Sequence, residues 1–321
     1  MDEAAVIAII AAGDAPRPGV LVGVGDDAAV LTGDPPVVLA HDMVVEDVHF
    51  RWATHSPGDL GHLALAVNLS DLAAMGAVPV AALVGLAAPP GALDPPTVRA
   101  IYSGLRTLGD AAGCAVVGGD TSAAPVTMLG VTAVGRMPPG VAPVLRSGGR
   151  PGDLVCVTGT IGASAAGRAL LGGPPHTGDG AAALVAAHRR PAPRLAAGAA
   201  LAALGAHAMM DVSDGLALDL ERLARASGLH ARLDLDAVPV APGVPAVAAR
   251  TGAAADEWAV AGGEDYELLV ALPEDLLAPA RARLDVPLTP VGHLAAGPPG
   301  LTALRDGTPV ALARRGWEHD V

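Results

Sequence analysis

The feature that most constrains this chain is one apolar stretch, residues 62–76, that carries polar side chains inside it. Its apolar residues recur at helical spacing, and it ends at Gly76, a residue suited to the left-handed conformation that closes many helices. Asn68 and Asp71 are three residues apart, so on a helix they project from one face. Burying them is costly unless polar groups meet them. The stretch therefore predicts a helix with a polar site against it.

An isolated aspartate in such a place is more often a cap or a solvent-facing residue. Two observations favour a functional reading of Asp71. Asn68 is the only asparagine and the chain has no glutamine, so amide side chains are not filler. Further carboxylates also occur among glycines and small apolar residues elsewhere in the chain.

Length and composition limit the fold and the chemistry. A chain of 321 residues divides most naturally into two domains, and with 51% hydrophobic but 2% aromatic residues its core must consist of Ala, Val and Leu. All 20 basic residues are arginine, which excludes a P-loop lysine, a protein-kinase lysine and a lysine Schiff base. Any phosphate must therefore be bound by arginine, backbone amides or metal.

The net charge of -13 argues against nucleic acid as a partner, because no basic stripe could neutralise a phosphate backbone. Clustered carboxylates are instead what hard divalent cations require. Cys114 and Cys156 lack nearby ligand partners and are interpreted as buried thiols in a reducing compartment. The acidic start of the chain does not resemble a secretory signal, and the apolar run 195–206 is too short to cross a bilayer. We expect a cytoplasmic protein that does not bind membranes.

The order of elements in the first part of the chain predicts an α+β domain. The first domain, residues 1–136, is expected to contain helices over 1–12, 62–76 and 95–112 and strands over 20–24, 28–31, 37–40, 80–88, 115–117 and 126–134. Residues 137–152 are rich in Pro, Gly and Arg and form the predicted linker. The second domain, residues 153–321, is expected to open with a strand over 153–158 and to contain a helix over 216–226.

The segment Gly23–Ala28 fits the dinucleotide pattern G-x-G-x-x-A. In a Rossmann turn this position brings backbone amides to a pyrophosphate, whereas here two adjacent carboxylates, Asp26 and Asp27, occupy it and a second strand follows. We therefore interpret the two aspartates as metal ligands, with ordinary turn residues as the alternative.

Other acids follow predicted strand ends. Asp42 comes after the strand 37–40, with His49 nearby, and Asp120 comes after two glycines where the strand 115–117 is expected to stop. Asp211 and Asp214 follow residues 208–210, although Asp214 taken alone is more simply the cap of helix 216–226. Five or six such acids meeting in space would bind several Mg²⁺ ions, which suits phosphoryl transfer without lysine.

Two further motifs are polar segments among glycines. The Gly-rich turn 159–164 leads into a helix and would serve either as an anion site or as a tight connection. The segment 262–268, GGEDYEL, leads into a strand. Phe50, Tyr266 and Trp317, half of the six aromatic residues, adjoin the polar clusters and would form either a packing contact or a stacking surface for a ring.

Taken together, several motifs resemble thiamine-monophosphate kinase, within the superfamily that includes aminoimidazole ribonucleotide synthase. They are GVGDDAAVL, NLSDLAAMGA, GGDTS, VTGTIGASAAG, DVSDGLALDL, GGEDYELL and the terminal GWEH, in that order over nearly the whole chain. The resemblance implies an N-terminal domain that forms a homodimer through its sheet, an α/β C-terminal domain and an ATP site between them. It also implies transfer of the γ-phosphoryl group of ATP to thiamine monophosphate, giving thiamine diphosphate.

Matching positions carry the family's functional residues onto this chain. The resemblance implies Mg²⁺ ligands at Asp26, Asp42, Asp71, Asp120, Asp211 and Asp214. It implies ATP contacts at Gly119, Asp120, Arg146 and Ser213, and contacts with the thiamine end at His49, Glu264 and Trp317. No catalytic base is expected, because the attacking phosphate oxygen is already anionic.

One departure concerns the residues before Asp42. The family usually has Ser or Thr there, whereas this chain has Ala40 and His41, and imidazole is a poor ligand for Mg²⁺.

Three alternatives remain open at this stage. One is another ATP-using enzyme of the superfamily, although the cysteines that its selenophosphate and hydrogenase-maturation branches would need are not in the sequence. The second is a non-catalytic divalent-cation binder, and the third is a nicotinamide dehydrogenase.

Overall fold

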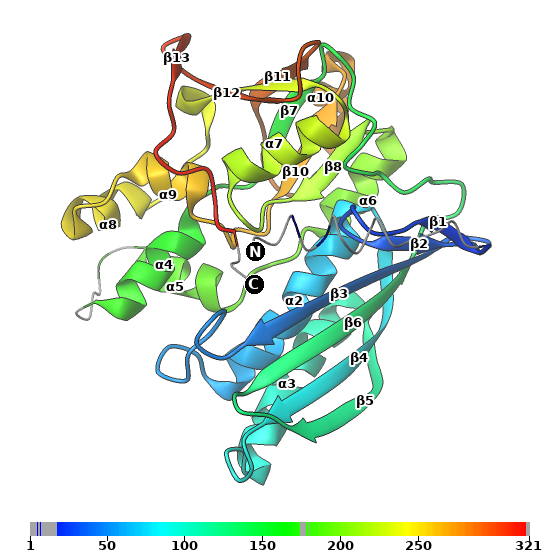
Figure 1. Ribbon diagram of the computed structural model, residues 1–321, viewed down its shortest axis with the longest axis vertical. Helices are drawn as coiled ribbons and strands as arrows, with labels where there is room; N and C mark the ends of the chain where they lie inside the picture. Colours follow the sequence, from blue (N-terminus) through cyan, green and yellow to red (C-terminus); the bar gives the residue numbers. More distant parts are fainter. Residues whose placement is uncertain (1–4, 6, 8–17, 174–177, 179, 319–321) are drawn as a thin grey trace.

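The computed structural model describes residues 5, 7, 18–173, 178 and 180–318, and it contains two sheets that each carry helices (Figure 1). Most of the helix predicted over 1–12 lies outside the described residues. The helices are α2 (Pro57–Ala74), α3 (Pro95–Ala112), α4 (Ala163–Gly172), α5 (Ala181–Arg189), α6 (Leu195–Leu204), α7 (Leu216–Ala226), α8 (Val244–Thr251), α9 (Ala255–Ala261) and α10 (Leu277–Arg283), with short 3₁₀ helices at Leu235–Ala237 and Glu274–Leu276.

The strands fall into two sets along the chain. The first set is β1 (Val20–Val22), β2 (Ala29–Leu31), β3 (Val37–Val45), β4 (Val78–Ala88), β5 (Ala115–Ala123) and β6 (Met128–Arg136). The second set is β7 (Leu154–Thr158), β8 (Ala208–Asp211), β9 (His230–Asp234), β10 (Leu268–Leu272), β11 (Leu288–Ala295), β12 (Gly300–Arg305) and β13 (Thr308–Val310).

The first sheet has the order β1-β2-β3-β6-β4-β5, and only its β4–β5 pair is parallel. Helices α2 and α3 pack against each other on one face of this sheet, and alternate strand residues such as Val84 and Val131 are buried beneath them. The opposite face leaves apolar side chains exposed, including Val80 (44%), Leu83 (46%) and Val117 (62%). One face of the sheet is therefore a core and the other is an open apolar surface.

Two strands of this sheet are longer than predicted, and both differences place functional residues inside strands. The predicted strand 37–40 continues to Val45, and the predicted strand 115–117 continues to Ala123. The expectation that these strands stop before Asp42 and Gly118 is therefore wrong. Polar residues and glycines fit these extensions because the residues of β5 are largely exposed and those of β3 are exposed from His41 to Met43.

The second sheet has the order β13-β12-β9-β11-β7-β10-β8 and is covered by helices on both faces. Alternate residues of its central strands enter two different cores. In β10, Leu269 packs with the cluster that contains α7, whereas Leu268 packs with the cluster that contains α6 and α10. Every residue of β10 is buried, which explains its unbroken run of apolar residues.

Helix α2 joins the two parts of the molecule (Figure 1). It starts at Pro57, five residues earlier than the predicted start, because Ser56 and Asp59 form a capping box there. It is buried on nearly all sides, against the first sheet and α3 on one side and against α6 and β8 on the other. A Cβ on Gly198 of α6 would lie 2.0 Å from the Ala73 carbonyl oxygen, so glycine permits this close approach.

The segment between β6 and β7, residues 137–153, contains no helix or strand and crosses from one sheet to the other. None of the helices in the described ranges is both long and apolar enough to cross a membrane.

Candidate active site

A cavity of about 1130 Å³ is lined by residues from both sheets and from the connecting segment. The structure places ten of the twelve predicted site residues on its wall. They are Asp26, Asp42, His49, Asp71, Arg146, Asp211, Ser213, Asp214, Glu264 and Trp317.

Three carboxylates converge in this cavity, and we call them the acid triad: Asp27, Asp71 and Asp211. One oxygen from each lies within 4.8 Å of the others. Asp27 lies two residues before β2, Asp71 lies in the last turn of α2, and Asp211 ends β8. The resemblance carried over Asp26 but not Asp27, although the adjacent pair of aspartates was the signal for both. Because each member comes from a different element, only folding brings the triad together.

Mutual repulsion and burial disfavour the charged form of these groups. Burial raises the pKa of Asp211 well above its ordinary value, and the charge of Asp27 raises it further. Burial likewise raises the pKa of Asp71 well above its ordinary value, and neighbouring carboxylates, Asp42 first, add to the effect. Burial and the charge of Asp27 raise the pKa of Asp26 to about 6. Carboxylate oxygens crowded in this way suit a hard divalent cation, which would remove the repulsion.

Arg146 brings the connecting segment into the site. Its guanidinium donates to Asp27, at 2.8 Å from Nη2 to Oδ1 and 3.2 Å from Nε to Oδ2. Its backbone N–H lies 3.2 Å from both carboxylate oxygens of Asp26. One guanidinium therefore offsets part of the negative charge and leaves a net negative site.

The polar residues of α2 form hydrogen bonds with residues of other elements. Asn68 Oδ1 accepts from the backbone N–H of Asp42 at 2.9 Å, and Asn68 Nδ2 donates to the Ala64 carbonyl oxygen at 3.0 Å. Ser70 Oγ donates to Asp211 Oδ2 at 2.6 Å. Asn68 and Ser70 are fully buried, so the predicted polar partners of this helix exist: they are β3 and β8.

The loop before α7 is organised by an acid that the sequence analysis did not single out. Asp219 is fully buried, and one of its oxygens accepts from the backbone N–H groups of Ser213, Asp214 and Gly215 at 3.0 to 3.1 Å. The simpler alternative for Asp214, a helix cap, is wrong, because the N-cap residue is Gly215 and carries no side-chain cap. Asp214 instead forms an ion pair with Arg222 and lines the cavity.

The hydrogen-bond donors at the Gly-rich turn 159–164 are already bound by carboxylates of the same chain. Asp265 accepts from the backbone N–H groups of Gly162, at 2.9 Å, and Ser164, at 3.4 Å, at the start of α4. Glu267 accepts from Thr158 Oγ1 at 2.7 Å and forms an ion pair with Arg194. The turn is therefore a tight connection and not an open anion site.

The three residues predicted for the thiamine end line the same cavity from three segments. Glu264 has a φ of 59°, which is unusual for a non-glycine residue. His49 Nδ1 accepts from the backbone N–H of Val45 at 3.1 Å, which fixes the ring beside the end of β3. Trp317 is 49% exposed, and its backbone N–H donates to the Asp214 carbonyl oxygen at 2.9 Å. His319 of the same terminal motif lies outside the described residues.

Gly119 and Asp120 do not line the cavity, because they lie in the edge strand β5. Three inter-strand steps separate β5 from β3, a distance of about 14 Å. A Cβ on Gly119 would lie 1.8 Å from the Val84 carbonyl oxygen, so this glycine is needed for strand pairing. Within one chain, the structure separates this motif from the other predicted ligands.

The residue that replaces the expected hydroxyl before Asp42 contacts the neighbouring strand. His41 Nδ1 lies 2.9 Å from Thr132 Oγ1 on β6. The Thr132 hydroxyl, rather than a metal ion, is thus the partner that the structure gives to this imidazole.

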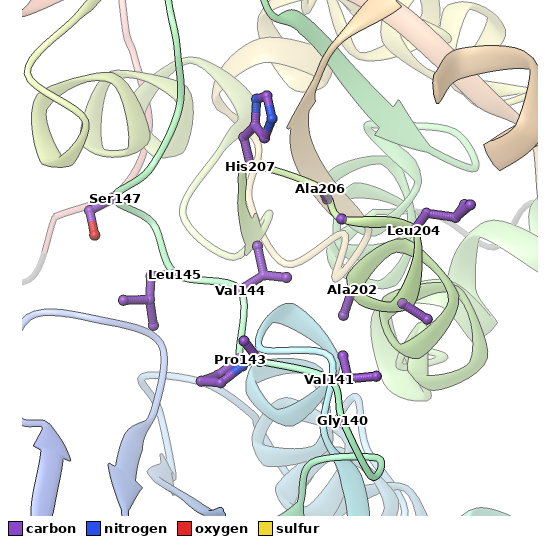
Figure 2. Close-up of a pocket in the computed structure, with 13 residues that line it drawn as sticks. Gly140, Val141, Pro143, Val144, Leu145, Ser147, Ala202, Leu204, Ala206 and His207 are labelled. Atoms are coloured by element: carbon purple, nitrogen blue, oxygen red, sulfur yellow. The ribbon is translucent and has the colours of Figure 1, made fainter. Parts of the chain in front are cut away.

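A second, smaller cavity of about 480 Å³ lies between the connecting segment and the α6–β8 turn (Figure 2). Its wall is mostly Ala, Val, Leu and Pro, and its one histidine, His207, bonds to Asp153 at 2.9 Å. It contains no group of acids, so the larger cavity is the candidate site.

Two parts of the chain match family models of AIR synthase related proteins, residues 25–137 the N-terminal domain and residues 150–297 the C-terminal domain. The fold and the site thus define a protein of the AIR synthase related class. Thiamine-monophosphate kinase of Salmonella typhimurium is 40% identical over 311 residues, covering 94% of this chain and 93% of the relative. That of Bacillus subtilis is 36% identical over 329 residues and covers 99% of both. The chain belongs to the thiamine-monophosphate kinase family.

Solved structures agree with this membership. A structure described as AaThiL complexed with AMPPCP and TMP superposes with a TM-score of 0.86 at 30% identity, covering 99% of this chain and 97% of that one. Hydrogenase maturation protein HypE in complex with ATP has a TM-score of 0.72 at 21% identity, covering 90% and 88%, which is a likeness of fold.

Proposed function

We propose that this chain transfers the γ-phosphoryl group of ATP to the phosphate of thiamine monophosphate, giving thiamine diphosphate. The observation that carries the proposal is the acid triad in a cavity shared by both halves of the molecule, in a chain that belongs to the thiamine-monophosphate kinase family. The relative solved as AaThiL was complexed with both AMPPCP and TMP. A nucleotide and an acceptor that bind together in one site are what direct transfer requires.

The residues at the site fit several Mg²⁺ ions. The acid triad, with Asp26, Asp42 and Asp214 on the same wall, offers only oxygen ligands, which Mg²⁺ prefers. Burial first and neighbouring carboxylates second raise the pKa values of Asp71 and Asp211, so a bound cation would stabilise their charged forms. When bound, the ions would shield the phosphates of donor and acceptor from each other.

The protein's own groups would bind and align the two anions. Arg146 would hold the ATP phosphates through its guanidinium, and Ser213 would contact them from a loop whose backbone N–H groups donate to Asp219. The acceptor phosphate oxygen is already anionic, so no side chain needs to remove a proton. Positioning and charge shielding therefore account for the catalysis that we propose.

The thiamine end carries a permanent positive charge on its thiazolium ring. Glu264 would attract that charge, His49 would contact the acceptor from the side of β3, and Trp317 would stack on a ring at the cavity mouth. The exposed indole of Trp317 is consistent with a stacking surface that is open before the acceptor binds.

The exposed apolar face of the first sheet supports a homodimer in which a second copy covers this face. In such a dimer the edge strand β5 of one copy would bring Gly119 and Asp120 to the nucleotide bound by the other. A mixing experiment tests this arrangement: inactive Asp120→Asn and inactive Asp71→Asn proteins, refolded together, should recover about a quarter of wild-type activity. If Asp120 acts within its own chain, the mixture stays inactive.

The central experiment is an ATP-consumption assay with thiamine monophosphate, with and without Mg²⁺, in which the thiamine product is identified. Mg²⁺-dependent thiamine diphosphate is the expected product. ATP binding without any change of thiamine monophosphate would overturn the proposal and favour another ATP-using reaction of the same fold. Metal binding without ATP binding would favour a cation-binding protein.

A further inference from the structure

Behind the Glu264 carboxylate lies a buried pair of side chains that none of the proposed roles uses. His188 Nδ1 lies 3.4 Å from Glu264 Oε2 and 3.0 Å from Ser164 Oγ. Ser164 Oγ lies 3.5 Å from the same Glu264 oxygen. An ionised carboxylate only accepts hydrogen bonds, so the hydrogens within this group point from Ser164 and His188 toward Glu264. His188 is 7% exposed and Ser164 is fully buried.

Glu264 is held firmly at its backbone, which leaves its side chain as the part that needs support. Its N–H donates to the Ser213 carbonyl oxygen at 2.6 Å, and its side chain is 26% exposed toward the cavity. Burial alone raises the pKa of Glu264, but the hydrogen bond and charge of His188, together with the charges of Arg168 and His49, outweigh it and place that pKa below its ordinary value. The carboxylate is thus ionised, with one side open to the cavity and the other in contact with His188.

His188 is itself held by the N-terminal half of the molecule. It lies in the last turn of α5, which packs beside α4, the helix that has Ser164 in its first turn (Figure 1). Its ring meets the His55 ring edge-on, with centroids 5.2 Å apart. His55 is 2% exposed, and burial lowers its pKa to about 4, so it packs as a neutral ring. Within the described residues, His55 Nε2 has no hydrogen-bond partner, so its role here is packing.

We propose that His188 is a positioning residue that, together with Ser164, fixes the Glu264 carboxylate for the cationic end of the acceptor. The inference rests on the proposed function, since it presumes that Glu264 receives the thiazolium. A carboxylate fixed before binding loses less conformational freedom when the ligand arrives. Loss of His188 should therefore weaken acceptor binding and leave ATP binding and the chemical step nearly unchanged.

The test compares two substitutions of His188 in the full-length protein. His188→Leu removes the donor, whereas His188→Asn keeps an N–H close to the position of Nδ1. We expect the leucine variant to raise the KM for thiamine monophosphate about 10-fold, with kcat and the KM for ATP within about 2-fold of wild type. The asparagine variant should recover most of the loss.

A matched control and a double variant separate positioning from general destabilisation. His207→Leu removes another histidine of the same half, half-buried and bonded to Asp153, and should lower Tm without changing the KM for thiamine monophosphate. In a Glu264→Gln background, His188→Leu should have little further effect on this KM, because the group that it positions has lost its charge. Ser164→Ala, which leaves the packing intact, should raise the KM in the same direction.

Two results would overturn the inference. The KM for thiamine monophosphate could be unchanged in His188→Leu and in Ser164→Ala, or the effects of His188→Leu and Glu264→Gln could simply add. If His188→Leu does not fold, Ser164→Ala decides alone. Wild-type protein that makes no thiamine diphosphate overturns the proposed function itself, which keeps the two failures distinct.

Discussion

Two groups of carboxylates in this chain differ in how many hydrogen-bond donors surround them. The first group, which we call the paired acids, consists of Asp219, Asp265 and Glu267, and each accepts hydrogen bonds from two or more backbone or side-chain donors. The acid triad instead shares one arginine and one serine among three carboxylates. The paired acids hold loops in place, whereas the acid triad keeps negative charge that a bound cation would neutralise.

The difference follows from position in the fold. The paired acids lie beside helix starts or arginines, where donors are already present, and two of them accept from the backbone N–H groups of the turns before α4 and α7. The acid triad lies where three elements end together, with few donors nearby. Burial by itself therefore does not identify a functional acid in this protein; the balance of donors and charges around it does.

The largest effect on activity is expected from substitutions in the acid triad. Asp211→Asn or Asp71→Asn should lower kcat at saturating Mg²⁺ by about 10³-fold or more, because the ligand oxygens for the cation lose a charge. The Tm should stay the same or rise, since one repulsive charge is removed. Steady-state kinetics and thermal denaturation measure both effects. Asp110→Asn, an exposed position at the end of α3, is the matched control; near-normal turnover in either triad variant removes that residue from the metal site.

The second largest effect, on the free energy of unfolding, is expected from replacing one of the paired acids. Glu267→Gln leaves the Arg194 guanidinium without its counter-charge in a site where the Glu267 side chain is 4% exposed. The free energy of unfolding should fall by about 3 kcal/mol, as expected when one partner of a buried ion pair is removed. Urea unfolding measures the change. A loss below about 1 kcal/mol would mean that solvent or neighbouring groups replace the glutamate, and that the two classes of acid differ less than we infer.

The third and smallest expected effect is a dependence of protein stability on pH. Because the pKa of Asp26 is raised in the folded state from 3.8 to about 6, the folded protein binds more protons than the unfolded chain within this range. Without metal, this contribution makes the protein less stable as pH rises from about 4 to about 6. Since Mg²⁺ needs the charged form, the rise in Tm on adding Mg²⁺ should be larger at pH 7.5 than at pH 5.

Differential scanning fluorimetry with and without Mg²⁺ checks this expectation. Asp71→Asn should reduce the Mg²⁺-dependent shift at pH 7.5, whereas Asp110→Asn should not. An equal Mg²⁺ shift at both pH values would show that protons and the metal do not compete at this site.

The helices that the sequence predicted best are those with clear ends. Residues 95–112 and 216–226 match α3 and α7 in full, because prolines or a glycine mark their starts and an apolar face repeats along them. The strands β3 and β5 were predicted too short. Their continuations contain glycines and polar residues, and those are compatible with a strand only because this part of the sheet is exposed.

The candidate site was partly predictable for a related reason. The polar motifs and the family resemblance that they carry indicated ten residues of the cavity wall, because chemistry requires those residue types. The position of Asp120 was not predictable, since it depends on the order β3-β6-β4-β5, which places a later strand at the sheet edge. Asp219 gave no signal of its own, because an acid in the first turn of a helix is common.

The sequence by itself determined which side chains are available: oxygen ligands without lysine, a buried polar helix and motifs shared with thiamine-monophosphate kinases. Local patterns set these properties, because caps, periodicity and residue chemistry act over a few neighbours. Only the tertiary structure decided which acids are neutralised and which are left crowded, and that His188 supports Glu264 from 76 residues away along the chain. The physical reason is that charge balance depends on distance in space, and folding alone sets that distance.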